Sequence, residues 1–92
     1  MNAHNRGVVT RLIGDIDRFA SGEIELDEMQ SKLQAALTLC ERDGSTAWEA
    51  VRLAEADVEE IQFTTLLDEQ RPAAVFRLDQ LREALTTELD VA

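Results

Sequence analysis

The stretch VVTRLIGDIDRFASGEIELDEMQSKLQAAL, residues 8–37, decides the fold class, because it holds two amphipathic runs separated by a turn signal. The apolar side chains of each run recur every three or four residues, which is the spacing of one face of an α-helix. Between the runs, Ser21-Gly22 ends the first helix, since glycine readily adopts the left-handed conformation found after helices. We therefore predict helices over residues 8–20 and 26–42, with Asp43-Gly44 ending the second.

Two further segments follow the same helical period. The third helix is predicted to begin at Ser45 or Thr46 and to reach at least Gln62, or as far as Leu67. The fourth is predicted over residues 72–89, because proline is tolerated in a first helical turn and disfavours helix in the residue before it. The core is expected to be built from Val9, Leu12, Ile13, Ile16, Phe19 and Ala20; Leu26, Met29, Leu33, Ala36, Leu37 and Cys40; Ala47, Val51, Ala54, Val58 and Ile61; and Ala74, Leu78, Leu81, Leu85 and Leu89.

Short connections between four amphipathic helices favour an antiparallel up-down arrangement. We therefore predict one all-α domain over residues 1–92, an antiparallel up-down four-helix bundle, with residues 1–7 as a flexible tail. Two capping boxes are predicted at helix starts, in which a side chain at the cap and one three residues later bond reciprocally to the backbone. They pair Asp27 with Gln30, and Thr46 with Glu49.

The composition is strongly acidic. Asp and Glu number 19 against 9 Lys and Arg, for a formal net charge of -10. This charge argues against direct binding to nucleic acid, which needs a basic footprint, and against binding to an anionic membrane surface. It favours either a basic protein partner, approached with electrostatic steering, or simple solubility, and charge alone leaves both interpretations open.

The residues that usually carry chemistry are scarce. The one histidine, His4, lies in the predicted tail, and the one cysteine, Cys40, lies on an apolar helix face, where an inert thiol is expected. No phosphate-binding loop, zinc spacing or Glu-x-x-His pair of a di-iron bundle is present. We therefore expect no enzymatic activity, no metal and no cofactor. Without an apolar run long enough for a membrane span or a signal peptide, we expect the chain in the cytoplasm.

The third helix carries the most informative side chains. Glu55 and Glu59 are four residues apart and Asp57 and Glu60 are three apart, so that like charges repel along the helix. Trp48 falls at the border of the apolar stripe, beside these acids, and tryptophan ringed by charges is a common interface anchor. We predict that these five residues bind a basic partner. The alternatives are a solvated acidic face and a tryptophan that closes the rim of the core.

Two phenylalanines do not fit the stripes of their helices. Phe63 projects away from Val58 and Ile61, and Phe76 projects almost opposite Leu78. We expect them to meet around the connection at residues 68–72 and to cap one end of the bundle. The alternative is an apolar patch for a partner or for a second copy of the chain.

The stretch IDRFASGEIELDEM, residues 16–29, resembles a pattern of bacterial toxin-immunity proteins of the colicin D immunity type. In that pattern a first helix ends in an aromatic residue, a Gly-x-Ile turn follows and an acid-rich second helix begins. Phe19, Gly22 and Ile24 match this spacing, whereas Met29 stands where the pattern has an aromatic residue. The resemblance implies a four-helix protein that blocks a nuclease toxin with a basic, tRNA-cleaving site. The three matched residues look architectural and bring no toxin-contacting role with them.

From these observations we expect an acidic helical binding protein that masks a basic surface, with an immunity protein against a nuclease toxin as its most specific form. The competing hypothesis is a structural or regulatory module that self-associates, a homodimer included, through Phe63 and Phe76.

Overall fold

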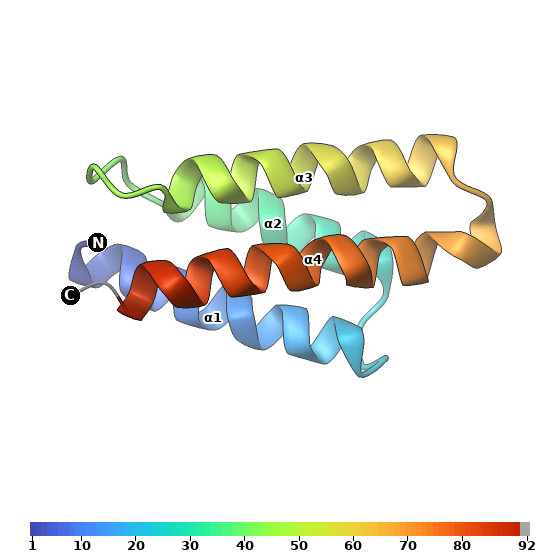
Figure 1. The fold of residues 1–92 in the computed structure, drawn as a ribbon, viewed down its shortest axis with the longest axis horizontal. Coiled ribbons are helices and arrows are strands. Elements are labelled where there is room, and N and C mark those ends of the chain that lie inside the picture. The colour runs from blue at the N-terminus through green and yellow to red at the C-terminus, as the bar shows by residue number, and fades with distance from the viewer. Residues whose placement is uncertain (91–92) are drawn as a thin grey trace.

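The computed structural model describes residues 1–90, which form four α-helices and their connections. These helices are α1 (Ala3–Ala20), α2 (Leu26–Leu39), α3 (Ala47–Thr64) and α4 (Leu67–Asp90). Each connection reverses the chain, so that successive helices run antiparallel (Figure 1). Each helix packs against its neighbours in the chain, and α4 also packs against α1. The all-α four-helix bundle predicted from the sequence is confirmed.

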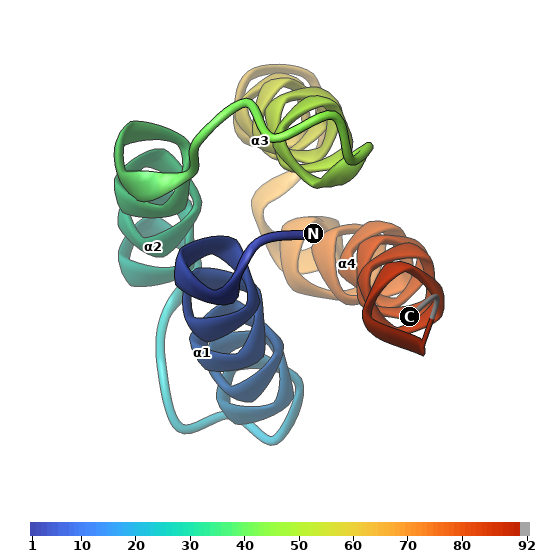
Figure 2. The same ribbon diagram turned by 90° about the vertical axis from the view of Figure 1, so that its left-hand side faces the viewer.

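The core fills the space between the four helices, which stand at the corners of a rough square when viewed along the bundle (Figure 2). Most residues of the predicted stripes supply it, because residues three and four apart lie on one helix face, but Ala20 is exposed and Val8 is buried instead. Phe19, at the end of α1, and Leu78, near the middle of α4, are both fully buried. The matched residues of the first turn are architectural, as expected. Ile24 is buried, and Gly22 has a φ of 89°, a conformation that glycine adopts without steric cost.

The prediction of a flexible tail over residues 1–7 is wrong. Asn2 caps α1 by accepting a hydrogen bond from the Asn5 amide, and the helix begins at Ala3. Asn5 is fully buried, and its side chain bridges the backbone of Glu41 with bonds of 2.6 and 2.8 Å. A long-range bridge of this kind leaves no trace in helical periodicity, so these residues resembled a polar tail in the sequence.

Two predicted helix boundaries were also wrong. α2 ends at Leu39 rather than at residue 42, because the chain turns there to meet the N-terminus of α1. α4 begins at Leu67, so that Pro72 lies inside the helix rather than at its start. The residue before the proline, Arg71, is held in place by side-chain hydrogen bonds to carbonyl groups at the α1–α2 connection. That tertiary anchor overrides the local preference of the residue before a proline.

Neither predicted capping box forms. Glu25 is the N-cap of α2 without a side-chain bond, and the Gln30 side chain reaches across to α3 instead. Thr46 is the N-cap of α3, as predicted, but its side chain makes no capping bond, and Glu49 pairs with Arg52. In both cases the side chain three residues after the expected cap bonds to another side chain, Glu55 for Gln30 and Arg52 for Glu49, instead of to the backbone of the helix start.

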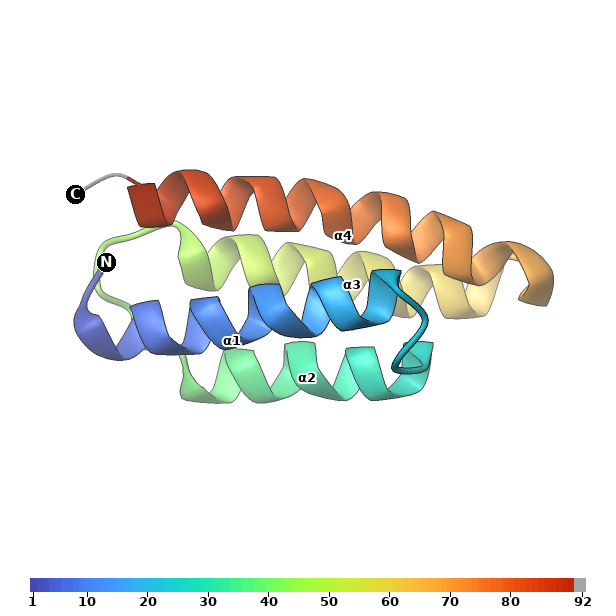
Figure 3. The same ribbon diagram turned by 90° about the horizontal axis from the view of Figure 1, so that it is seen from below.

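The hairpin of α3 and α4 extends past the end of α1 and α2. Figures 1 and 3 show the connection between α3 and α4 projecting beyond the α1–α2 connection, at the end of the bundle opposite the N-terminus. The difference follows from helix length, since α2 has 14 residues whereas α4 has 24. Within residues 1–90, no helix combines the length and hydropathy that crossing a membrane requires.

Candidate protein interface

The projecting end of the α3–α4 hairpin carries three large exposed apolar side chains within five residues of chain. Phe63, Leu66 and Leu67 are 82%, 70% and 85% exposed. A leucine exposed singly on a protein surface is ordinary, but a contiguous apolar group is typical of a contact surface. We call residues 59–69, the last turn of α3, the connection and the first residues of α4, the hairpin tip.

The exposure of the tip follows from helix phase and helix length. Phe63 lies five residues after the buried Val58, which turns it by about 140° at 100° per residue, away from the core. Leu66 belongs to the connection and Leu67 is the first residue of α4. Figure 3 shows this end of the α3–α4 hairpin beyond the α1–α2 connection. The chain closes this turn with the Gln70 side chain, which donates to the carbonyl groups of Gln62 and Thr65.

Four exposed carboxylates flank these apolar side chains along the chain. Glu59 and Glu60 lie before them on α3, and Asp68 and Glu69 follow them on α4. In the described part of the chain, none of the four carboxylates forms an ion pair with an arginine or lysine. The tip therefore carries an exposed apolar group flanked by carboxylates without an ion-pair partner in residues 1–90, and protein interfaces likewise combine an apolar centre with a polar rim.

The five residues predicted to bind a partner do not form one strip. Glu59 and Glu60 are exposed on the tip, as described above. Glu55 faces α2, where the side-chain amides of two glutamines, Gln30 and Gln34, donate to it at 2.8 and 3.2 Å. Asp57 faces α4 and accepts a 2.6 Å bond from the Arg77 guanidinium. Contacts between helices therefore engage Glu55 and Asp57.

Trp48 lies at the other end of α3 from the tip. It is half-buried, and the guanidinium of Arg42 stacks over its ring at 4.2 Å from the centroid. The helix rise of about 1.5 Å per residue separates Trp48 from Glu60 by roughly 18 Å. The structure thus does not bring Trp48 together with the exposed acids of the tip.

The expectation that Phe63 and Phe76 meet and cap the bundle is wrong. Phe76 is 70% exposed and lies on α4 at the edge of a different feature, a groove between α1 and α4. The reason is the early start of α4, because the extra helical turns before Pro72 place Phe76 well inside the helix and away from the connection.

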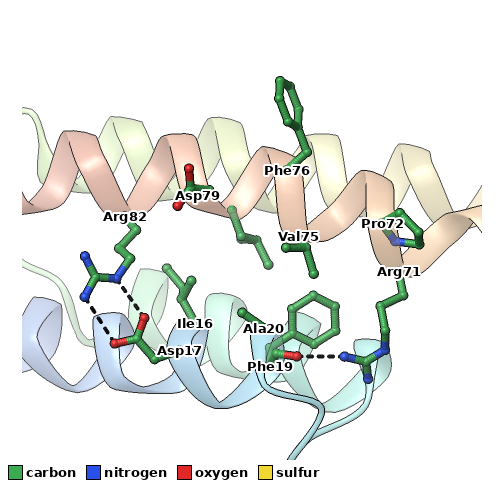
Figure 4. A pocket seen from close by; sticks show the side chains of 11 residues that line it. Ile16, Asp17, Phe19, Ala20, Arg71, Pro72, Val75, Phe76, Asp79 and Arg82 are labelled. Carbon is green, nitrogen blue, oxygen red and sulfur yellow. Dashed lines mark hydrogen bonds and ion pairs between the residues drawn. The ribbon is translucent and has the colours of Figure 1, made fainter.

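The groove has a volume of about 540 Å³ and an apolar floor that includes Ile16, Phe19 and Val75 (Figure 4). An arginine from α4 stands at each end. Arg71 donates to the Phe19 and Ile24 carbonyls at 2.7 and 2.8 Å, with its guanidinium 4.5 Å from the centroid of the Phe19 ring. The bond to Phe19 ties α4 to the carbonyl end of α1, which carries partial negative charge, and the bond to Ile24 ties it to the α1–α2 connection.

Arg82 stands at the other end of the groove and grips Asp17 of α1 with two bonds of 2.7 and 3.2 Å (Figure 4). The hydrogen bond from Arg82 lowers the pKa of Asp17 below the usual value of an aspartate side chain. Neither arginine was singled out from the sequence, because each bonds to a partner more than fifty residues away.

The region around Cys40 offers no activated nucleophile. Burial raises the pKa of the Cys40 thiol, and the nearby charges of Asp43 and Glu41 raise it further. A thiol that holds its proton is a poor nucleophile. The Nε2 atom of His4 lies 2.8 Å from the Leu39 carbonyl oxygen, a bond that fastens α1 to the end of α2. Among residues 1–90, no three His, Cys, Asp or Glu side chains are grouped as a metal site requires.

Leu66 and Leu67 are interface candidates that helical periodicity does not reveal, because the periodicity allows the third helix to extend as far as Leu67. The available signal was two consecutive leucines in a connection, between Thr64-Thr65 and Asp68-Glu69. Comparison with protein-family models, with curated proteins and with solved structures gives no match for this chain.

Proposed function

We propose that this chain is a binding protein that masks a basic surface of another macromolecule, with the hairpin tip as its contact surface. The observation that carries the proposal is the tip itself, in which Phe63, Leu66 and Leu67 stand exposed among four carboxylates that have no cationic partner in the described part of the chain. Interfaces are commonly built from a few apolar anchors with charged residues at the rim.

The two parts of the tip have different roles in this proposal. Burying the apolar side chains supplies affinity, at roughly 25 cal/mol per Å² of apolar area removed from water. The carboxylates steer the encounter with a basic surface and reject acidic ones, and they act mainly on the association rate. Like-charge repulsion between neighbouring acids, such as Glu59 and Glu60 here, is relieved when a cationic partner binds.

The most specific form of the proposal is an immunity protein that blocks a nuclease toxin. A nuclease site binds phosphates and is therefore basic, so an acidic apolar tip would occupy the surface meant for nucleic acid. Two features support this form: the net charge of -10 and the resemblance of residues 16–29 to immunity proteins of the colicin D type. The contact itself lies on the tip and not on the matched residues, which are buried or turn-forming.

A pull-down from the lysate of the source cell at low and at high salt tests the proposal. The test variant is Glu59→Lys/Glu60→Lys on the tip, and the matched control is Glu28→Lys/Asp90→Lys, which changes the net charge equally at exposed sites elsewhere. We expect a basic partner that the wild type and the control retain at low salt and that the tip variant loses. Equal retention of the partner by all three proteins would refute the tip as the contact surface. Equal loss of the partner by both variants would show that net charge, and not the tip, governs binding.

The apolar part of the tip has its own test. Leu67→Ser is expected to shorten the lifetime of the complex at either salt concentration, because it removes an anchor without changing charge. Leu53→Ser, at an exposed leucine on the outer face of α3, is the control. Unchanged dissociation of the Leu67 variant would show that the tip does not bury its apolar centre.

A further inference from the structure

The groove face of α4 has the spacing of a helix-pairing seam. Asp68, Pro72, Val75, Asp79 and Arg82 follow one another at intervals of four, three, four and three residues. This alternation keeps the side chains on one side of the helix, as in a helix that packs lengthwise along another. All except Asp68 line the groove between α1 and α4.

The charges along this seam are arranged symmetrically about Val75. Arg71 lies four residues before it and Asp79 four residues after it, while Asp68 lies seven before it and Arg82 seven after it. When two such helices pack antiparallel with a two-fold axis at Val75, Arg71 faces Asp79 of the second copy, and Asp68 faces Arg82. A two-fold axis makes each pairing occur twice, since the same patch is used on both copies.

These groups remain free to pair between copies. In the described part of the chain, Asp68 and Asp79 have no ion-pair partner. Arg71 gives its Nη1 and Nη2 donors to neutral carbonyls, and its nearest carboxylate is that of Glu25 at 3.7 Å. Arg82 uses Nε and Nη2 for Asp17. Because a guanidinium carries five N–H donors, both arginines can serve a second acceptor.

An exposed apolar side chain lies at the centre of the same seam. Phe76 is 70% exposed beside Val75, and its side chain points away from α1 (Figure 4). One residue from the two-fold axis, it would lie close to Val75 and Pro72 of the second copy. A phenylalanine buries 150–250 Å², roughly, when it is fully covered.

We propose that α4 forms an antiparallel two-fold pair with α4 of a second copy, centred on Val75 and closed on either side by Arg71–Asp79 and Asp68–Arg82 ion pairs between copies. The occupant of the groove face is thus this chain itself. The pairing is distinct from the proposed masking of a basic surface, because Phe63, Leu66 and Leu67 at the tip take no part in the seam, and Asp68 is the one residue of the tip that the seam uses.

Charge substitutions at the two ends of the seam test the pairing, because a monomer cannot produce energetic coupling between the two positions. Asp68 and Arg82 are fourteen residues apart on one helix, about 21 Å at 1.5 Å per residue. At physiological salt this exceeds the screening length of about 8 Å, so the two charges barely interact within one chain. Coupling between the two positions therefore requires a second molecule.

The experiment is sedimentation equilibrium on the full chain over a range up to about 100 µM, a range in which weak dimers are resolved. We expect a dimer for the wild type, at least tenfold weaker association for Asp68→Arg and for Arg82→Asp alone, and recovery in the double variant, where the swapped charges face each other again. Circular dichroism of each variant checks that the bundle is intact. A monomeric wild type, or a double variant as weak as the single ones, overturns the pairing.

Phe76→Glu provides a second measurement, with Leu53→Glu as its matched control on the outer face of α3. The first substitution should give a folded monomer and the second a dimer. A dimer that survives Phe76→Glu but is lost on Phe63→Glu would place self-association at the tip and overturn the α4 seam. If native mass spectrometry shows a monomer with a bound small molecule, the groove has a different occupant, and this result would also overturn the α4 pairing.

Discussion

Substitution of Asn5 by alanine separates the effect of helix propensity from that of tertiary contacts, because the two predict changes of opposite sign in the free energy of unfolding. Alanine is the better helix former, so propensity alone predicts a gain of up to about 0.5 kcal/mol. The structure predicts a loss. Asn5 is fully buried, and its side chain accepts from the Glu41 amide and donates to the Glu41 carbonyl. Alanine removes both bonds and leaves two backbone groups without their partner.

The magnitude follows from these contacts. Each of the two hydrogen bonds contributes about 1 kcal/mol net, and more where the orphaned group stays away from water. Because Glu41 itself is exposed, water can reach part of its backbone, which keeps each bond near that lower figure. After the gain in propensity, Asn5→Ala should destabilise the protein by roughly 2 kcal/mol, out of a total of about 5–14 kcal/mol for a domain of this size. The melting temperature should fall by roughly 8–16 °C.

Urea unfolding followed by circular dichroism measures this change, with Thr10→Ala as the control at an exposed position of the same helix. The control isolates propensity and should be neutral or slightly stabilising. Hydrogen exchange adds a local measurement, since the Glu41 amide donates to Asn5 and should lose its protection. If the free energy of unfolding of Asn5→Ala equals that of the control, the Asn5–Glu41 bridge does not stabilise the attachment of the α2–α3 connection to α1.

Three further predictions concern the same fold. The pKa of Asp43 lies well below its usual range, chiefly because the Ser45 hydroxyl and the Asn2 and Ser45 amides donate to it. Since the folded pKa is lower than the unfolded value of about 3.9, this stabilisation is complete above about pH 5 and is lost progressively as the pH falls through the folded pKa. Urea midpoints should therefore drop in acid by less for Asp43→Asn than for the wild type. Gly22→Ala should cost about 1 kcal/mol at its φ of 89°, whereas a stabilising or neutral effect on thermal unfolding would contradict the described turn. Arg71→Lys should lower the free energy of unfolding by about 1.5–3 kcal/mol, because an ammonium cannot replace the forked pair of bonds to two carbonyls, and an unchanged urea midpoint would count against that anchor.

Helical periodicity predicted the fold because most of the core lies on single helix faces. Val51 and Val58 on α3, and Leu78 and Leu85 on α4, are each buried where the spacing placed them. The boundaries depended on contacts between distant residues. Arg71 holds the turn before a proline in helical form, and no local rule indicates that its partners lie at the end of α1. The element types therefore followed from local physics, and the ends of α2 and α4 followed from tertiary contacts.

The candidate interface was predictable in part. Glu59, Glu60 and Phe63 could be named from helix phase, because residues on the outer face of an amphipathic helix are solvated. Glu55 was named for the same reason, yet its side chain accepts hydrogen bonds from two glutamines of α2. Such a contact can be predicted only when the relative placement of the two helices is known. Leu66 became a candidate only once the lengths of α3 and α4 were known, since its exposure depends on where α1 ends and α2 begins.

The overhang of the α3–α4 hairpin also has a consequence for motion. Its last turns have few buried neighbours, so opening them requires far less free energy than unfolding the whole bundle. Amide hydrogens of residues 63–69 should therefore exchange through local fraying, while those beside Val58 and Leu78 exchange only with global unfolding. A contact surface on such a segment can adjust its backbone to the shape of another molecule, and the core of the bundle stays packed while it does so.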